Sequence, residues 1–176
     1  CTLILGDNLF FAQGFSKKLQ SVGIMEKGGC TIFSAQVKDP ERYGVVEISQ
    51  QGEVISLEEK PKEPKSNLAV TGLYFFDDQA VEFAKLLKPS KRGELEILDL
   101  IRCYLRQDKL HVEQLGRGAA WLDTGTHDAL LKASLFIQVV EERQGLKIGC
   151  PEEIAWRMEY IDDSQLELLA QSSMKS

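Results

Sequence analysis

The chain has 176 residues, 43% hydrophobic and 27% charged, a composition that fits a globular domain and excludes disordered, collagen-like and low-complexity classes. The formal net charge is −6 and the sequence has no basic block, so a non-specific nucleic-acid binder is not expected. No apolar run approaches the roughly 18 residues of a membrane span, and no signal peptide is visible. We therefore expect neither a nucleic acid nor a membrane as a partner.

The cysteine pattern excludes a zinc ribbon and a dithiol redox motif. No C-x-x-C occurs, and His111 and His127 are not near a pair of cysteines. Cysteines scattered in this way are typical of reduced, core-filling thiols in a cytosolic protein. The four cysteines are Cys1, Cys30, Cys103 and Cys150.

The first half of the chain predicts mostly strands. The apolar runs at residues 2–5 and 69–76 are typical of strands buried on both faces, as in parallel sheets. The short loop at residues 49–53 predicts a hairpin between the strands that flank it. Strands are predicted at residues 2–5, 30–37, 43–48, 54–59 and 69–76, and helices at residues 16–25 and 77–87.

The second half predicts more helix. Apolar residues at helical spacing indicate helices at residues 94–107 and 126–143. Short strands are predicted at residues 110–115 and 120–122, and another after Gly145. Two further helices are predicted to begin near Pro151, which suits a first helical position, and near Asp163.

This order predicts an α/β fold, with a mixed, mostly parallel sheet, an inserted hairpin and helices at the C-terminus. Ligands of such sheets bind beyond the carboxyl ends of strands. Asp7 and Asp123 each follow a predicted strand, and carboxylates there can bind a divalent cation such as Mg²⁺ together with phosphate oxygens. Both can equally be turn residues, and their spacing in the sequence does not show that they converge.

Two charged segments can bind phosphate. Lys60 follows a predicted strand directly after Glu59, and Pro61 is expected to hold Lys60 extended. Arg92 precedes a predicted helix, where it can also bind an anion. A solvated run of charges is the alternative for both segments. No P-loop or G-x-G-x-x-G motif occurs, and neither histidine lies in a nucleophile motif.

Seven segments, in order and with natural spacing, make the sequence resemble the glucose-1-phosphate thymidylyltransferase family in its short bacterial form. The resemblance extends over nearly the whole chain, and a set of seven segments is far more specific than any one of them. They read LILGDN, DPERYGVVE, SLEEKPKEPKSN, AVTGLYFFD, RGELEI, GRGAAWLDTGTHDALL and EERQGLKIGCPEEIAWR.

The resemblance implies a Rossmann-like nucleotidyltransferase that moves a thymidylyl group from dTTP to glucose 1-phosphate and releases pyrophosphate. It implies that the metal ligands are Asp7 and Asp123. It gives Lys60 and Arg92 the role of binding phosphate in catalysis. The implied sugar-binding residues are Asn8, Tyr43, Gly44, Glu59 and Val70. A regulatory nucleotide site is implied, more weakly, around Glu153, Ile154 and Arg157.

The resemblance also implies the setting of the enzyme. It implies Mg²⁺ as cofactor, a cytoplasmic homotetramer, and a role in making dTDP-sugars such as dTDP-rhamnose for O-antigen and other polysaccharides. Residues 1–145 are expected to form the sugar-phosphate and metal-binding part of the nucleotidyltransferase domain. Residues 146–176 are expected to form a helical region for regulatory or oligomer contacts.

The family's Gly-rich segment, with the Arg and Lys that bind the triphosphate, has no counterpart in this sequence. The chain is therefore expected to be a fragment that lacks dTTP binding and activity by itself, so the activity above is assigned to the parent protein. Two alternatives remain open. One is transfer of a uridylyl or cytidylyl group to a sugar 1-phosphate, and the other is a non-catalytic domain that binds sugar phosphate.

Overall fold

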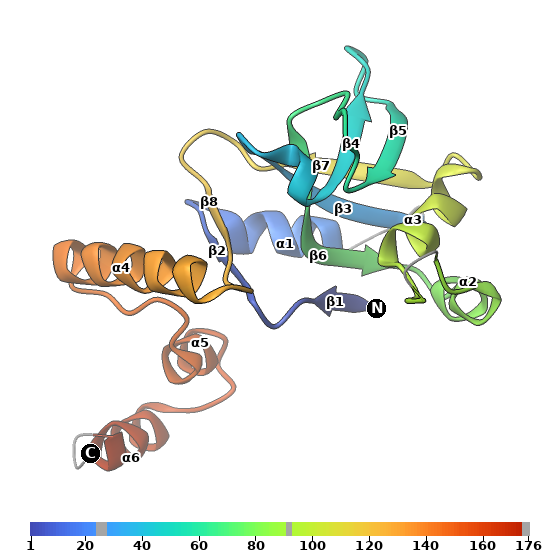
Figure 1. Cartoon of the computed structure of the whole chain (residues 1–176). Coiled ribbons are helices and arrows are strands. Elements are labelled where there is room, and N and C mark those ends of the chain that lie inside the picture. The colour runs from blue at the N-terminus through green and yellow to red at the C-terminus, as the bar shows by residue number, and fades with distance from the viewer. Residues whose placement is uncertain (24–27, 91–92, 174–176) are drawn as a thin grey trace. The chain divides into compact units, whose positions relative to one another are not determined.

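A computed structural model describes residues 1–23, 28–90 and 93–173 of the chain (Figure 1). The chain divides into two compact units, Cys1–Thr126 and His127–Ser176. This division falls before the long helix at residues 127–144, whereas the functional regions predicted from the sequence meet after it.

The first unit contains two sheets. The larger one has the order β5-β4-β6-β3-β7, with β1 beside β6, and a smaller one pairs β2 with β8. The strands of the larger sheet are β1 (Thr2–Ile4), β3 (Cys30–Gln36), β4 (Gly44–Ile48), β5 (Val54–Glu59), β6 (Leu68–Phe76) and β7 (Leu110–Gln114). Those of the smaller sheet are β2 (Asn8–Phe11) and β8 (Ala120–Asp123).

The sheet is mixed, as predicted, but the prediction that it is mostly parallel is wrong. Among the described strands only β3 and β7 pair in parallel, and the other pairings are antiparallel. β4 and β5 form the predicted hairpin, and a connection that short returns the chain antiparallel. β3 and β7 are far apart in the chain, and the segment between them contains β4, β5 and β6 as well as helices.

Both faces of the β3–β6 pair are buried, which explains their continuous apolar runs. Ile32 and Tyr74 belong to a core cluster with residues of α3, whereas Phe33 and Phe75 belong to a second cluster with Val22 of α1. Alternate residues of each strand thus point to opposite sides of the sheet. The helices of this unit are α1 (Phe15–Gly23), α2 (Ala80–Leu86) and α3 (Ile97–Leu105), and Pro40–Arg42 forms a short 3₁₀ helix, η1.

The first strand is where the burial prediction fails. Leu3 and Ile4 in β1 are 40% and 55% exposed, although their apolar run predicts burial on both faces. Within the described chain β1 pairs only with β6, along Leu73–Phe75, so one of its edges is unpaired there. Apolar residues alone do not distinguish such an edge strand from a central one.

Three other local predictions differ from the structure. Gly6 and Asp7 form a turn, as their residue types indicated, but Asn8 begins β2, a strand that was not predicted. The strand predicted after Gly145 is wrong, because residues 145–150 contain none. Helix α3 begins at Ile97 rather than at residue 94. The remaining predicted elements are observed within a few residues, except that the predicted end of the first helix, at residues 24 and 25, lies outside the described residues.

The second unit consists of helices. Pro151 is the first residue of α5, as predicted, and the indole Nε1 of Trp156 on α5 donates to Asp163 Oδ1 on α6 at 2.7 Å. No helix in the described part of the chain is both long and apolar enough to cross a membrane. The helices are α4 (His127–Gln144), α5 (Pro151–Arg157) and α6 (Asp163–Ser173).

Candidate functional site

A cavity of about 220 Å³ in the first unit gathers most of the site residues predicted from the sequence. Its walls come from the β1–β2 connection, the start of β4, the ends of β5 and β8, the middle of β6 and the start of α3. Chain segments more than 100 residues apart thus meet at one cavity. The predicted residues in its walls are Asp7, Asn8, Tyr43, Gly44, Glu59, Lys60, Val70 and Asp123.

The two candidate metal ligands lie together because β2 and β8 pair. Asn8 is opposite Asp123 in this antiparallel pair, which brings Asp7 next to Asp123. A Cβ atom added at Gly125 would lie 3.2 Å from both Asp7 Oδ2 and Asp123 Oδ1, so the two carboxylates face the same small space. The convergence that the sequence alone could not establish is present.

This carboxylate pair fits a hard divalent cation. Such a cation takes oxygen ligands and commonly uses one or two protein carboxylates, with phosphate oxygens and water completing the coordination. The described residues contain no group of three or more His, Cys, Asp or Glu side chains that could hold a metal ion alone. The donor set therefore suits a cation that arrives with a phosphorylated substrate.

Asn8 links Asp7 to β6 and β8. Its Oδ1 accepts the backbone N–H of Gly72 at 2.9 Å and the indole N–H of Trp121 at 2.6 Å, and its Nδ2 donates to Asp7 Oδ1 at 2.8 Å. The two donors on Oδ1 fix which end of the amide is the oxygen. The second N–H of Nδ2 takes no part in these bonds.

Glycines give this part of the site its close packing. A Cβ atom at Gly72 would lie 2.6 Å from Asn8 Oδ1, and one at Gly44 would lie 2.6 Å from Leu98 Cδ1. Gly44 was expected to allow close approach of a ligand. The structure adds a packing reason for it, since α3 occupies the place of its side chain.

The extended conformation predicted for Lys60 is wrong. Its φ is +42°, in the left-handed region that a side chain with Cβ seldom adopts. The Lys60 N–H donates to Tyr43 O at 3.0 Å, one residue beyond the β4–β5 pairing of Gly44 with Glu59. This bond and the turn that follows β5 outweigh the preference that Pro61 imposes. The side chain of Lys60 is exposed at the cavity.

Aromatic residues form a further wall, and sequence reasoning identified only Tyr43 among them. The Tyr43 and Trp121 rings lie edge to face with centroids 5.0 Å apart, and the Arg42 guanidinium lies 5.5 Å from the Tyr43 ring centroid. Burial raises the pKa of Tyr43, and Tyr74 on the cavity wall has a pKa raised by burial first and then by the charge of Glu59. Both hydroxyls therefore stay protonated and can donate.

Sequence reasoning missed seven residues that line the cavity: Leu5, Arg42, Gly72, Tyr74, Ile97, Leu98 and Trp121. The sequence contained a signal for two of these residues, because each lies close to a residue that was predicted. Arg42 precedes Tyr43 in the DPERYG segment, and Trp121 lies two residues before Asp123.

Three of the predicted residues lie elsewhere, and Arg92 is outside the described residues. Glu153, Ile154 and Arg157 are on α5 in the second unit, where Arg157 Nε donates to Glu153 Oε1 at 2.8 Å and Ile154 is 55% exposed. Their regulatory role stays a prediction.

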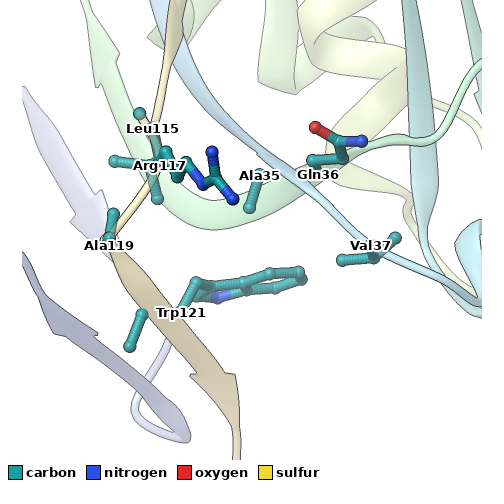
Figure 2. Close-up of a pocket in the computed structure, with 10 residues that line it drawn as sticks. Ala35, Gln36, Val37, Leu115, Arg117, Ala119 and Trp121 are labelled. Atoms are coloured by element: carbon teal, nitrogen blue, oxygen red, sulfur yellow. The ribbon is translucent and has the colours of Figure 1, made fainter.

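Trp121 also borders a second hollow, of about 530 Å³, shown in Figure 2. This hollow lies between the end of β3 and the loop that joins β7 to β8, and the side chains of Arg117 and Trp121 both extend into it. One tryptophan therefore separates two concave regions, and its indole N–H is directed to Asn8 in the first of them.

Comparisons with known sequences show the family of this chain. The family described as nucleotidyl transferase matches residues 1–139. A glucose-1-phosphate thymidylyltransferase of Neisseria meningitidis serogroup A is 54% identical over 174 residues, which cover 99% of this chain and 60% of the relative. A glucose-1-phosphate thymidylyltransferase of Mycobacterium tuberculosis strain H37Rv is 51% identical over 177 residues, which cover 99% of this chain and 60% of that relative. The resemblance inferred from the seven segments is confirmed, and the chain spans about 60% of the length of these curated relatives.

Solved structures give the same fold. A Bacillus anthracis protein described as a glucose-1-phosphate thymidylyltransferase, in complex with a sucrose, has a TM-score of 0.65 and 39% identity. The match covers 77% of this chain and 53% of that one. A UDP-glucose pyrophosphorylase complexed with UDP-glucose has a TM-score of 0.62 and 23% identity, and the match covers 77% of this chain and 54% of that one. At this identity the match supports the fold alone.

Proposed function

Because this chain belongs to the nucleotidyl transferase family, we propose that its protein transfers a thymidylyl group from dTTP to α-D-glucose 1-phosphate, giving dTDP-glucose and pyrophosphate. Relatives named for this activity, at 51–54% identity over 99% of the chain, support the choice of substrates. The observation that carries the proposal is the cavity itself. Asp7, Asp123 and Lys60 meet there with polar groups that can form hydrogen bonds to a sugar.

The chemistry requires positioning and charge neutralisation rather than a general base. The attacking phosphate oxygen of glucose 1-phosphate is already ionised, but two anionic substrates repel each other. In this proposal the ammonium group of Lys60 offsets that repulsion and holds the nucleophile in line with the departing pyrophosphate. Arg92 is proposed as a second phosphate ligand from the sequence alone.

The sugar is proposed to occupy the part of the cavity between β4, β5 and β6. Glu59 can accept hydrogen bonds from sugar hydroxyls, and the remaining N–H of Asn8 and the Tyr43 hydroxyl can donate to them. Val70 and the backbone at Gly44 offer close, shape-defining contacts. A site of hydrogen bonds to several hydroxyls discriminates strongly against sugars that lack them.

Nucleotidyl transferases generally use a divalent metal, and Mg²⁺ is the ion that we propose for Asp7 and Asp123. When bound, it supplies positive charge that stabilises the negative charge developing at the α-phosphate. The protein's contribution is to hold both carboxylates toward one point, which the pairing of β2 with β8 supports.

The setting proposed for the enzyme follows from its product. dTDP-glucose feeds the synthesis of dTDP-sugars such as dTDP-rhamnose, used in O-antigen and other polysaccharides, and we propose the cytoplasm as its location. A homotetramer is the proposed assembly, with the helices at residues 146–176 as candidates for regulatory or subunit contacts.

A substrate panel tests the proposal. The full-length protein is incubated with glucose 1-phosphate, Mg²⁺ and dTTP, UTP or CTP, and sugar nucleotides are separated by ion-exchange chromatography. We expect dTDP-glucose to form fastest. Faster formation of UDP-glucose or CDP-glucose would contradict the choice of base, and no product with any nucleotide would contradict the proposed class of reaction.

A further inference from the structure

Thr124 makes two hydrogen bonds to the same atom. Its backbone N–H and its Oγ1 hydroxyl both donate to Asp7 O, at 2.7 Å and 2.8 Å. The two residues are 117 positions apart, and Thr124 directly follows Asp123. A carbonyl oxygen has two lone pairs, and Thr124 alone supplies a donor for each.

These bonds connect the backbones of the two candidate metal ligands. The carbonyl belongs to Asp7, and the donors belong to the residue after Asp123, so neither backbone can shift without breaking them. The side chains are oriented separately. Asn8 Nδ2 donates to Asp7 Oδ1 at 2.8 Å, and the Gly125 N–H donates to Asp123 Oδ1 at 3.1 Å.

The strand pairing by itself leaves this junction weakly held. β2 and β8 have only four residues each, the pairing ends at Asn8 and Asp123, and Asp7 lies beyond it with an exposed side chain. The two bonds from Thr124 continue the connection past the end of the ladder. The hydroxyl is the part of this connection that depends on the residue type, since any residue except proline supplies the N–H.

We propose that Thr124 is a positioning residue that sets the separation of the Asp7 and Asp123 carboxylates for one divalent cation. The inference rests on the proposed function of these two aspartates. Thr124 acts through Asp7 and needs no contact with substrate. Groups that orient metal ligands typically change metal affinity by about 10- to 100-fold when removed.

Two substitutions separate the hydroxyl from the shape of the side chain. Thr124→Val removes the hydroxyl and keeps the volume and the N–H, whereas Thr124→Ser keeps a hydroxyl and removes a methyl group. Thr71→Val is the matched control, because Thr71 Oγ1 also donates to a backbone carbonyl, Phe33 O at 3.0 Å, but within the sheet core.

Binding of Mn²⁺ is the direct measurement. The full-length protein is titrated with Mn²⁺ in the presence of dTDP-glucose, and bound ion is read from the loss of the free-ion EPR signal, with Asp123→Asn as the reference without a complete site. We expect the Kd for Mn²⁺ to rise roughly 10-fold in Thr124→Val and to stay within about 2-fold of wild type in Thr124→Ser. Thr71→Val should lower the melting temperature and leave this Kd unchanged.

The outcomes are distinguishable from failure of the proposed function. If wild-type protein and Asp123→Asn bind Mn²⁺ equally, the metal-site assignment is wrong. If Asp123→Asn loses binding while folded Thr124→Val keeps the wild-type Kd, the aspartates bind the metal and the inference about Thr124 is overturned. An equal loss in the valine and serine variants would also overturn it, because the hydroxyl would then not be the cause.

Discussion

Lys60 combines a positive charge with a backbone conformation that lysine seldom adopts. A non-glycine residue at a φ of +42° stores roughly 1–3 kcal/mol of strain and persists only where the surroundings impose it. Its N–H is held by Tyr43 O, at the edge of the cavity. The strain is consistent with a lysine kept in place for its charge.

Removal of this charge should weaken sugar-phosphate binding. In Lys60→Gln we expect the KM for glucose 1-phosphate to rise by about 10- to 100-fold, because one charge-assisted contact to phosphate is lost. Lys62→Gln, two residues away and exposed, is the matched control and should stay within about 2-fold. The measurement is initial-rate kinetics at saturating dTTP. An unchanged KM in the Lys60 variant would exclude the proposed phosphate contact.

The sequence indicated the charged residues of the cavity more readily than the residues that hold them in place. Asp7, Asp123 and Lys60 follow predicted strands and carry charges, so local pattern made them candidates beside the alternatives of a turn or a solvated run of charges. Trp121 and Gly72 depend on contacts with Asn8 across 113 and 64 positions. Partners at such separations are set by strand pairing, which a single sequence does not reveal.

Strand β6 contacts Asn8 at Gly72, where it has no side chain. The Gly72 N–H donates to Asn8 Oδ1, and the amide of Asn8 lies where a Cβ atom of residue 72 would be. Strand β6 also pairs with β1, β3 and β4. A change at Gly72 therefore acts on a packed strand and on the cavity together.

Gly72→Ala tests this coupling. The added methyl group must displace Asn8, so we expect the free energy of unfolding to fall by about 1–3 kcal/mol and activity to fall with it. Gly116→Ala is the control, because a Cβ there meets nothing within 4 Å. Denaturant unfolding and the rate of product formation give the two readouts. A Gly72→Ala protein with wild-type stability and rate would show that Asn8 is not held as described.

A second junction joins β6 to α2 and α3 through Asp77. Its carboxylate accepts the Tyr104 hydroxyl and the Gly29 N–H, both at 2.7 Å, and two N–H groups of Gln79. Burial acts to raise the pKa of Asp77, but these hydrogen bonds outweigh it and hold the pKa below its ordinary value of 3.8. The ionised form is therefore favoured by folding.

The sign of the pH dependence follows from that shift. A carboxyl with a lowered pKa in the folded state adds stability above its unfolded pKa, and this contribution is lost as the pH falls through the folded pKa. From about pH 6 to about pH 3 the wild type should lose more unfolding free energy than Asp77→Asn, measured by urea unfolding at each pH. Asp78→Asn, at the exposed neighbour, controls for the change of net charge. Equal pH dependence in the wild type and Asp77→Asn would contradict this account.

Strands were predictable from the sequence where both faces of the sheet are buried in the core. β3 and β6 have the apolar runs expected of them, and the loop at residues 49–53 correctly indicated a hairpin. β1 has the same kind of run but is exposed, and β2 was hidden by the turn-forming residues before it. Local pattern reports chemical character, whereas burial and strand direction depend on neighbours supplied by distant segments.

For the whole molecule, the distribution of thiols gives a test of packing. All four cysteines are free, with Cys1 exposed and Cys30 fully buried. Burial, and then the charge of Asp77, raise the pKa of the Cys30 thiol, so it is both inaccessible and protonated.

Thiol labelling checks this arrangement. With DTNB we expect Cys1 to react first, the half-buried Cys103 and Cys150 more slowly, and Cys30 only after unfolding. A reducing agent should leave the melting temperature unchanged, because no disulfide is present. Peptide mapping of labelled protein identifies each site. Rapid labelling of Cys30 in folded protein would contradict the packing of β3.

In the proposed reaction, Asp7 and Asp123 lie side by side in one cavity and support nucleotidyl transfer by the full-length protein. The decisive measurement is pyrophosphate release from dTTP and glucose 1-phosphate over a range of Mg²⁺ concentrations. Asp123→Asn should lower kcat/KM by at least about 100-fold, whereas Asp128→Asn, exposed and paired with Lys132, should stay within about 2-fold. A wild-type rate in Asp123→Asn would contradict the account.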